Sequence, residues 1–393
     1  MNPYKIPFSG RAHAYTTTEV ETVVEAMQTA QPLTQGKYRH RFEASFVDFQ
    51  GGRGQAFAVG CATDALELTA QLCQFSPGDE FIIPAHTYTA SCYPFIKKGG
   101  SPVWADIDLQ SRVVTVDTIE KCLTSRTKVI VVVHLYGYVV EMDPILELAK
   151  AKDLLVVEDS AQAIGTKYRN QRAGTMGDFG IFSFHSHKNI STLGEGGMLW
   201  VHDPEYANLI PMLRHNGHCA FDFERQDYWI PAMGNVDLPE LSGNPLMPNN
   251  CCLGEVECAL GEQLLKRVDE INAEKRRRAL MFIDELKDFS ELEFHREDSE
   301  RHNYHLLVAR LTNGKRDQFI RTMAQEHSIQ CVVQYYPLNR YDLYRKLGFG
   351  EAVLPNTDAF FDNMVSFPFQ QTLSEADLSY MLDCTRQVLR SLN

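Results

Sequence analysis

The sequence lacks the features that mark a membrane or exported protein. Its most apolar run, Val129–Val133, is far shorter than a bilayer-spanning segment, and its β-branched residues suit a buried strand. The amino terminus has no basic start followed by an apolar stretch, so a secretory signal is not indicated. We therefore expect a cytoplasmic protein with no membrane partner.

Cysteines at metal-ligand or redox spacing are missing too. The ten cysteines are scattered without a C-x-x-C or Cys/His pattern, and most fall in segments with the pattern of core or helix. We expect reduced thiols and no metal site. Internal repeats and low-complexity stretches are also absent.

Positive charge is in short supply. Lys and Arg number 38 against 51 Asp and Glu, which gives a formal net charge of -13 at pH 7. This surplus of negative charge would repel a phosphate backbone, so nucleic acid is not an expected partner. The basic cluster at residues 275–278 is interpreted as the solvated face of a helix.

Length and pattern indicate two domains. A chain of 393 residues with 44% apolar composition exceeds what one compact core usually holds. From about residue 55, short apolar runs alternate with helical patterns, which predicts a mostly parallel, mixed sheet covered by helices. The fold class is therefore α/β, with a smaller α+β domain at the carboxyl end. The expected strands are residues 56–60, 80–84, 101–107, 128–137 and 154–161, and the expected helices begin near residues 63, 91 and 144.

A break in this pattern places the domain boundary. Residues 218–250 are rich in Pro and Gly and form a predicted loop that is too long for a simple connection. We expect a large domain over residues 1–248 and a small domain over residues 249–393. The apolar spacing of residues 256–271 predicts one long helix that bridges the domains. The small domain is completed by expected strands at 305–311 and 329–337 and a closing helix from about residue 374.

Three segments of the large domain carry residues suited to chemistry. In the first, GCATDAL (residues 60–66), a strand ends in small residues and a helix opens, so unpaired backbone N–H groups point outward. Such a turn can hold a phosphate. The structural alternative is that Thr63 only caps the helix.

The second segment, LLVVEDSAQAIG, brings two adjacent carboxylates to the end of an apolar strand. Side chains alternate along a strand, so Glu158 and Asp159 point to opposite sides and one of them can enter a site. That carboxylate could hold a protonated ring nitrogen, bind a metal or cap the following helix. Metal is disfavoured because no His or carboxylate recurs at ligand spacing nearby.

The third segment, FGIFSFHSHKNISTLGEGG, leads an apolar strand to Lys188 and then to a glycine-rich turn. A lysine between aromatic residues, histidines and glycines is in unusual company for a solvated side chain. Burial would lower its pKa and provide the neutral amine that a Schiff base requires. His134, His185 and His187 are interpreted as packing residues, without a catalytic role.

A phosphate cradle, an acidic strand end and a bracketed lysine match the needs of pyridoxal 5'-phosphate, namely an anchor, a partner for the pyridinium nitrogen and an amine for the aldehyde. From about Ile6 to Leu389 the chain resembles the DegT/DnrJ/EryC1/StrS family of sugar aminotransferases, which has the aspartate aminotransferase fold. The matching segments, in the expected order, are LTQGKYRHRFEASF, GCATDALELTA, PGDEFIIPAHTYTAS, VHLYG, VVEDSAQAIGTKY, GDFGIFSFHSHKNISTLGEGG and RHNGH.

The resemblance implies a role for each residue of the site. Lys188 would form the Schiff base and move the proton between the carbons of cofactor and substrate. Asp159 would pair with the pyridine nitrogen, and Gln162 would reach the ring hydroxyl. Tyr88 would stack on the ring face. The phosphate would be bound by Ala62, Thr63 and the hydroxyl of Ser183.

The resemblance also implies a homodimer whose site is completed by the neighbouring subunit, through an asparagine that corresponds to Asn250. The alternative for Asn250 is that it caps the helix that follows. The chain departs from the family's usual pattern at four places. These are Ala62-Thr63 in place of Gly-Thr, Cys252 in place of an arginine, Asn339 in place of a histidine, and the long segment 218–250. They bear on the sugar, not on the cofactor.

The function that the resemblance implies is transfer of an amino group from an amino acid, expected to be L-glutamate, to a keto or aldehyde sugar. We expect a nucleotide-linked sugar, in amino-sugar biosynthesis for a surface polysaccharide such as lipopolysaccharide or for a glycosylated metabolite. One alternative is the same chemistry on a non-nucleotide sugar such as an oxidised eight-carbon acid sugar. Two others are a sugar dehydratase, whose relatives carry histidine at the lysine position, and a regulatory relative without turnover.

Overall fold

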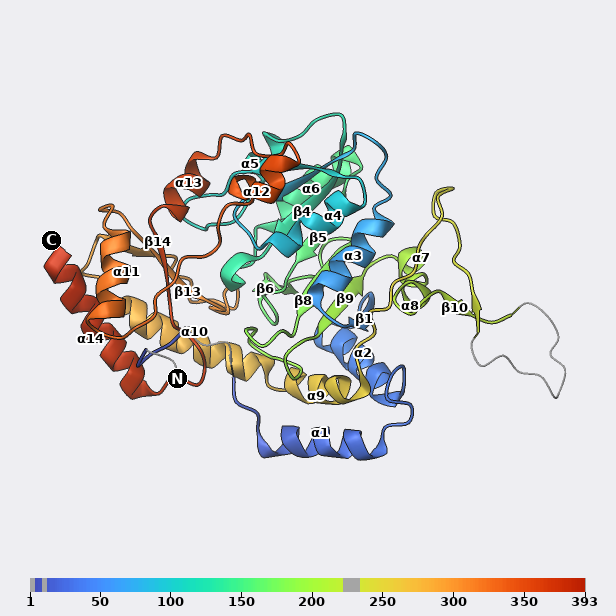
Figure 1. Cartoon of the computed structure of the whole chain (residues 1–393), viewed down its shortest axis with the longest axis horizontal. Coiled ribbons are helices and arrows are strands. Elements are labelled where there is room, and N and C mark those ends of the chain that lie inside the picture. Colours follow the sequence, from blue (N-terminus) through green and yellow to red (C-terminus); the bar gives the residue numbers. More distant parts are fainter. Residues whose placement is uncertain (1–3, 9–12, 222–233, 393) are drawn as a thin grey trace.

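A seven-stranded sheet forms the centre of the computed structural model, which describes residues 4–8, 13–221 and 234–392 (Figure 1). The strand order is β1-β9-β8-β5-β4-β2-β3. Strands β3, β2, β4, β5 and β8 run parallel, and β9 pairs antiparallel with both β8 and β1. The strands are β1 (Gln55–Val59), β2 (Glu80–Pro84), β3 (Ser101–Ala105), β4 (Thr127–Val133), β5 (Leu155–Asp159), β8 (Phe179–Ser183) and β9 (Gly197–Val201). The predicted α/β class with a mostly parallel, mixed sheet is confirmed.

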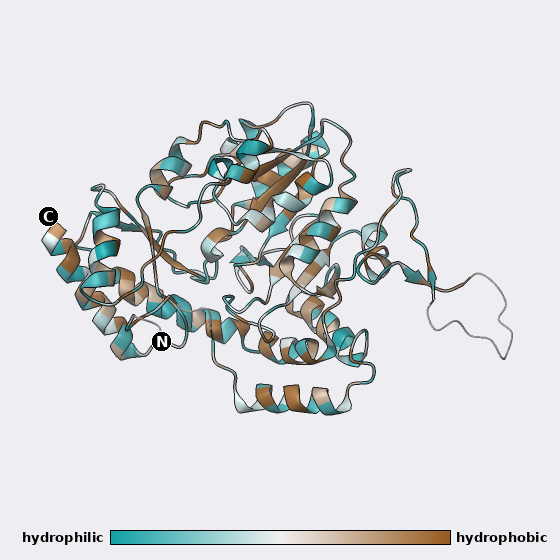
Figure 2. Ribbon diagram, in the orientation of Figure 1, coloured by the Kyte–Doolittle hydropathy of each residue, from teal (hydrophilic) through white to brown (hydrophobic). Residues whose placement is uncertain are grey.

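Helices cover both faces of this sheet. One face is covered by α3 (Ala62–Leu72), α4 (Tyr93–Lys97), α5 (Val116–Glu120) and α6 (Met142–Lys152), and the other by α2 (Lys37–Phe49) and α9 (Glu255–Leu265). Helix α1 (Thr17–Thr29) packs against α9 on the side away from the sheet (Figure 1). Side chains of β9 point alternately to the two helical layers. Leu199 packs with the first group of helices, and Met198 and Trp200 pack with the second. Figure 2 shows apolar central strands, with helices around them that carry both apolar and polar bands.

A smaller antiparallel sheet lies beside the large one, with its own hydrophobic cluster. It is made of β12 (Leu292–Phe294), β13 (Leu307–Leu311) and β14 (Met364–Phe367), and it packs with α10 (Val268–Asp284), α11 (Arg316–Gln325) and α14 (Glu375–Leu392). In Figure 1, α10 runs from α9 under the large sheet to the small one. The expected strand at 305–311 and the closing helix are thereby confirmed.

The remaining elements are short connections. They are the 3₁₀ turns η1 (Thr89–Ser91), η2 (Leu135–Gly137) and η3 (Leu338–Arg340), the strands β6 (Lys167–Tyr168), β7 (Gln171–Arg172), β10 (His218–Cys219) and β11 (Asn235–Val236), and the helices α7 (Pro204–Ala207), α8 (Ile210–Leu213), α12 (Asp342–Lys346) and α13 (Pro355–Phe361). Of the expected loop 218–250, residues 222–233 lie outside the described residues.

Two predicted elements are wrong. The single helix over 256–271 is two helices, because the backbone tightens to three-residue hydrogen bonds at Lys266 and Arg267, which interrupt the four-residue ladder. The expected strand 329–337 is an irregular segment that makes only isolated bridges, from Ile329 to Ile6 and from Val332 to Ser366. Its β-branched composition favoured a strand, but within the described chain it pairs with the neighbouring β14 only at Val332 and so forms no ladder with it.

The domain boundary after residue 248 stays a prediction. Helix α9 packs with α1, α2 and the large sheet, and the cluster of the small sheet begins on α10 at Ala279. The cores therefore divide along α10. The ten cysteines are all free. None of the helices in the described part of the chain combines the length and apolar character that crossing a membrane needs.

Candidate active site

A cavity of about 550 Å³ opens at the carboxyl ends of the central strands. In open α/β sheets this edge is where ligands bind, and the volume suits a small molecule. Seven of the eight predicted site residues line it, namely Ala62, Thr63, Tyr88, Asp159, Gln162, Ser183 and Lys188. The sequence therefore predicted which residues the fold would bring together, and the eighth, Asn250, lies elsewhere.

The start of α3 forms one wall of the cavity. Cys61 is the N-cap of this helix, and its N–H donates to Asp64 Oδ2 (3.1 Å). The capping alternative for Thr63 is therefore wrong, since Thr63 lies inside the first turn. Gly197 allows this close packing, because a Cβ there would lie 2.7 Å from the backbone N of Ala62. The first N–H groups of the helix are thus directed at the cavity, where they can bind an anion.

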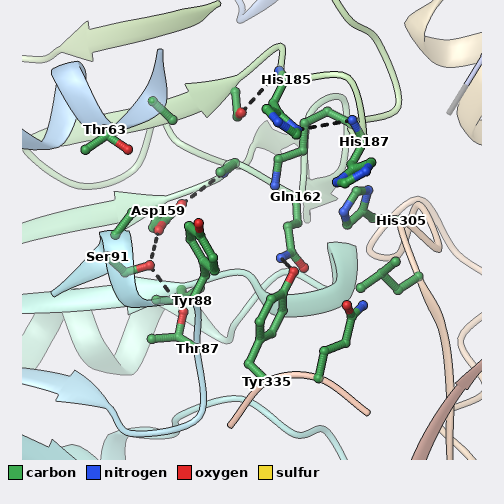
Figure 3. A pocket seen from close by; sticks show the side chains of 18 of the residues that line it. Thr63, Thr87, Tyr88, Ser91, Asp159, Gln162, His185, His187, His305 and Tyr335 are labelled. Carbon is green, nitrogen blue, oxygen red and sulfur yellow. Dashed lines mark hydrogen bonds between the residues drawn. The ribbon is translucent and has the colours of Figure 1, made fainter. Parts of the chain in front are cut away.

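Asp159, the last residue of β5, points into the cavity and is only 5% exposed (Figure 3). Ser91 Oγ donates to its Oδ2 (2.6 Å), and the N–H of Ala161 donates to its Oδ1 (3.1 Å). Both donors are neutral, so the carboxylate keeps its negative charge available for a ligand. Ser91 was not predicted, and the chain around it gives no signal beyond its place after a strand end.

Glu158 points the opposite way, as strand alternation predicts. Its oxygens accept from the N–H groups of Gly174 (2.9 Å), Met176 (2.6 Å) and Gly177 (2.6 Å) and contact Nε2 of buried His134 (2.9 Å). His134 Nδ1 accepts from the N–H of Val140 (3.2 Å), so Nε2 carries the proton toward Glu158. Both side chains hold the fold together, in line with the packing interpretation of His134.

Lys188 lies half-buried in the wall that follows β8. Burial lowers the pKa of its amine to about 8, and the neighbouring Asp159 carboxylate opposes this shift without cancelling it. A larger fraction of this amine is therefore neutral near pH 7 than for a solvated lysine. The sequence predicted this lowered pKa from the aromatic residues, histidines and glycines that flank Lys188.

Gln162 links the turn η2 to the irregular segment 329–337 at the cavity wall. Its Oε1 accepts from the N–H of Tyr136 (2.7 Å), and its Nε2 donates to the hydroxyl of Tyr335 (3.0 Å; Figure 3). The amide has one further N–H for a ligand. Tyr88 is 56% exposed, and its ring meets the ring of Tyr335 edge-on at 5.8 Å between centroids, so a face of Tyr88 is left open to the cavity.

Several histidines approach Lys188. His185 and His187 line the cavity, and the N–H of His187 donates to Nδ1 of His185 (3.2 Å). His305 is buried, and its pKa lies well below the ordinary value for histidine because of this burial and of the nearby charges of Lys188 and Lys275. Its Nδ1 lies 3.3 Å from Oδ1 of Asn189, the residue after Lys188. Figure 3 shows the rings of His187 and His305 close together.

Sequence reasoning missed the contribution of the carboxyl-terminal part of the chain. The cavity residues from this part are Lys275, His305, Leu306, Gln334, Tyr335, Phe369 and Gln370. The solvated interpretation of the basic cluster is wrong for Lys275, which is 4% exposed and faces the cavity. It holds for Arg277, which is exposed and pairs with Glu274 and Glu375. Lys275 lies four residues from both Ile271 and Ala279, on the buried face of α10, and this helical spacing could have signalled the difference.

The departures from the family pattern lie mostly outside this cavity. Ala62 and Thr63 line it, but Cys252 and Asn339 do not. Cys252 Sγ donates to the carbonyl O of Arg214 (3.3 Å), and Asn339 is 8% exposed. Asn250 is exposed, bridges to His215 and precedes α9 by several residues. The cap of α9 is Gly254, so the capping alternative for Asn250 is wrong.

The residues of the cavity fit pyridoxal phosphate. The open N-terminus of α3 suits a phosphate, the buried carboxylate of Asp159 suits a protonated ring nitrogen, and the Lys188 amine has the lowered pKa that condensation with an aldehyde needs. No group of three or more His, Cys, Asp or Glu side chains among the described residues could hold a metal ion. The donors are those of an organic cofactor.

Comparison with known proteins also indicates an enzyme that uses pyridoxal phosphate. The DegT/DnrJ/EryC1/StrS aminotransferase family matches residues 14–386. GDP-perosamine synthase of Caulobacter vibrioides is 32% identical over 94% of this chain and 95% of its own. The spore coat polysaccharide biosynthesis protein SpsC of Bacillus subtilis is 30% identical over 99% and 97%. The PLP form of Spr1654 from Streptococcus pneumoniae has a TM-score of 0.84 at 26% identity, over 99% of this chain and 100% of that one.

The fold and the cavity define a pyridoxal-phosphate-dependent aminotransferase, and the chain is an enzyme of this class. It belongs to the DegT/DnrJ/EryC1/StrS aminotransferase family.

Proposed function

We propose that this sugar aminotransferase transfers the amino group of L-glutamate to the carbonyl carbon of a nucleotide-linked keto sugar, in the cytoplasm, for a surface polysaccharide. The observation that carries the proposal is the convergence of the Lys188 amine, the Asp159 carboxylate and the open start of α3 on one cavity. The names of relatives support the acceptor, since one contains a nucleotide-linked amino sugar and another a coat polysaccharide.

When bound, pyridoxal phosphate supplies an electron sink that stabilises negative charge on the substrate carbon. Asp159 would keep the ring nitrogen protonated, and Ser91 and Ala161 hold that carboxylate in place. The N–H groups of Ala62 and Thr63 and the hydroxyl of Ser183 would bind the phosphate, and Tyr88 would stack on the ring. Gln162 contacts the ring hydroxyl while Tyr335 fixes its amide.

Lys188 has two roles in this proposal. Its amine would hold the cofactor by condensing with the aldehyde, and the freed amine would be the group that moves protons to and from the reacting carbons of donor and sugar. The lowered pKa places the amine between base and acid near neutral pH. One group can therefore serve both halves of the reaction.

A homodimer forms part of the proposal, with Asn250 reaching the partner's site. Two features support it. Asn250 is exposed and is not used as a helix cap. Helix α1 presents Val20, Val24 and Met27 at 51%, 46% and 65% exposure on one stripe, as expected of a surface that another subunit covers. Apolar bands on α1 are visible in Figure 2.

Glutamate-dependent amination of a panel of sugars tests the activity. The cofactor-loaded protein is mixed with L-glutamate and either 3-keto or 4-keto nucleotide sugars or an oxidised eight-carbon acid sugar. We expect 2-oxoglutarate and a nucleotide-linked amino sugar in equal amounts. Amination of the acid sugar alone would replace the nucleotide-linked acceptor, and a deoxy-keto product without glutamate consumption would indicate a dehydratase.

Mixed dimers test the shared site. Lys188→Ala and Asn250→Ala subunits are inactive or weakened alone, but a mixed dimer has one site with both native residues. Random mixing is therefore expected to restore activity well above the sum of the two variants. Additive activity, or a monomer in analytical ultracentrifugation, would contradict the shared site.

A further inference from the structure

The cavity wall formed by α10 carries a second lysine. Lys275 is 4% exposed, and its Nζ donates to the carbonyl oxygens of His305 (3.0 Å) and Phe369 (3.3 Å). An ammonium has three N–H donors, so one remains for a ligand in the cavity that Lys275 lines. No carboxylate of the described residues forms an ion pair with it.

Burial of the Lys275 ammonium without a counter-charge costs free energy, and a bound anion would offset that cost. Two carbonyl oxygens satisfy hydrogen bonds but do not neutralise a buried positive charge. Burial accordingly lowers the pKa of Lys275 to about 7. The acidic groups of the cavity are engaged elsewhere, since Asp159 accepts from Ser91 and Glu195 lies 3.7 Å from His185. The cation is therefore placed to meet a charge that a ligand brings.

The surroundings of Lys275 indicate what kind of anion this is. The cradle for the cofactor phosphate is built by α3 and the end of β8, which are different elements. Lys275 instead contacts the main chain of His305, whose ring reaches Asn189 next to Lys188. A charge bound at Lys275 thus belongs to a molecule whose reacting carbon lies near the Lys188 amine.

We propose that Lys275 binds the carboxylate of a substrate, an inference that rests on the proposed aminotransferase function. Two substrates can bring this group. One is the amino-acid donor, which has a carboxylate on the carbon that gives up the amino group, and the other is an acid-sugar acceptor. Donor and acceptor occupy the same cavity in turn, so one ammonium can serve either.

Matched variants separate the charge of Lys275 from its hydrogen bonds. Lys275→Gln keeps N–H donors for the two carbonyls but removes the charge, and Lys275→Arg keeps the charge. Lys266→Gln, at an exposed position before α10, is the control. Cofactor absorbance and unfolding by urea show that each variant folds. If Lys275→Gln does not fold, Lys275→Arg carries the test, with the expectation that carboxylate affinity is kept.

The half-reactions are then measured one at a time. With L-glutamate alone, Lys275→Gln is expected to raise the dissociation constant about 10- to 100-fold, the usual effect of a charge-assisted hydrogen bond, while the limiting rate changes little. If the carboxylate belongs to the acceptor, glutamate affinity stays unchanged and the acid sugar is weakened instead. A neutral keto sugar should be unaffected.

Binding without turnover gives an independent readout. Glutarate, a dicarboxylate with no amino group, is titrated into the same proteins by calorimetry, and weaker binding to Lys275→Gln than to Lys266→Gln supports the inference. Unchanged binding of glutamate, glutarate and the acid sugar in Lys275→Gln would overturn it. If the wild-type protein aminates no sugar, the proposed function fails, whereas the glutarate titration still reports on Lys275.

Discussion

Glu158 and Asp159 are neighbours in β5, yet their carboxylates lie on opposite faces of the sheet. Glu158 is fully buried among backbone N–H groups and His134, while Asp159 lines the cavity beside Ser91. Two chemically similar side chains therefore have separate tasks, because strand alternation sends one to the fold and the other to the site.

Paired amide substitutions should separate these tasks. Asp159→Asn removes the charge that would face the ring nitrogen, so we expect a loss of 10²-fold or more in turnover, about 3 kcal/mol, with little loss of stability. Glu158→Gln leaves buried N–H donors facing an amide, and we expect a free energy of unfolding lower by roughly 2–4 kcal/mol. Kinetics and urea unfolding of both variants give the comparison; equal effects in both assays would contradict the division.

Lys188→Ala should abolish covalent attachment of the cofactor and transamination together. Reduction with borohydride should fix the cofactor to residue 188 in the wild-type protein and to no lysine in the variant, as mass spectrometry of peptides would show. Lys150→Ala, on the exposed side of α6, is the matched control and should behave as wild type. Labelling at Lys275 instead would show that Lys188 is not the residue that binds the cofactor covalently.

Tyr335→Phe should weaken the site without destroying it. The substitution removes the hydroxyl that accepts from Gln162 Nε2 at 3.0 Å, which costs about 1 kcal/mol and a roughly 5-fold effect. We expect this loss in cofactor affinity, measured by equilibrium dialysis, with retained attachment to Lys188. An unchanged affinity would show that Tyr335 does not position the Gln162 amide.

Stability of the cofactor-free protein should rise from pH 7 to pH 9. Burial lowers the pKa of Lys275 to about 7, so across this range the unfolded chain binds a proton that the folded chain has released. The free energy of unfolding then gains about 2 kcal/mol from Lys275. Lys188, with a pKa of about 8, acts in the same direction.

Urea unfolding of Lys275→Gln at several pH values isolates this contribution. The variant has no titrating group at position 275, so its stability should rise less steeply with pH than that of the wild type. Parallel pH profiles for the two proteins would mean that Lys275 keeps an ordinary pKa.

The parts of the site that the sequence predicted are those with local signals. A strand that ends in carboxylates, a helix that opens after small residues and a lysine among aromatics are each visible within a few residues of chain. Tyr335 gives no such signal, because it reaches Gln162 from 173 residues away in a segment with the composition of a strand. The break at Lys266 was hidden for a related reason, since apolar spacing of three or four residues continues through it.

The two lysines of the cavity are carried by different parts of the molecule. Lys188 and Asp159 are fixed by strands of the seven-stranded sheet, whereas Lys275, His305 and Phe369 stand at the edge of the cluster under the three-stranded one. A substitution that reshapes the second group leaves the spacing within the first untouched. Substrate preference in this scaffold can consequently drift, in evolution or by engineering, while the reaction itself is conserved.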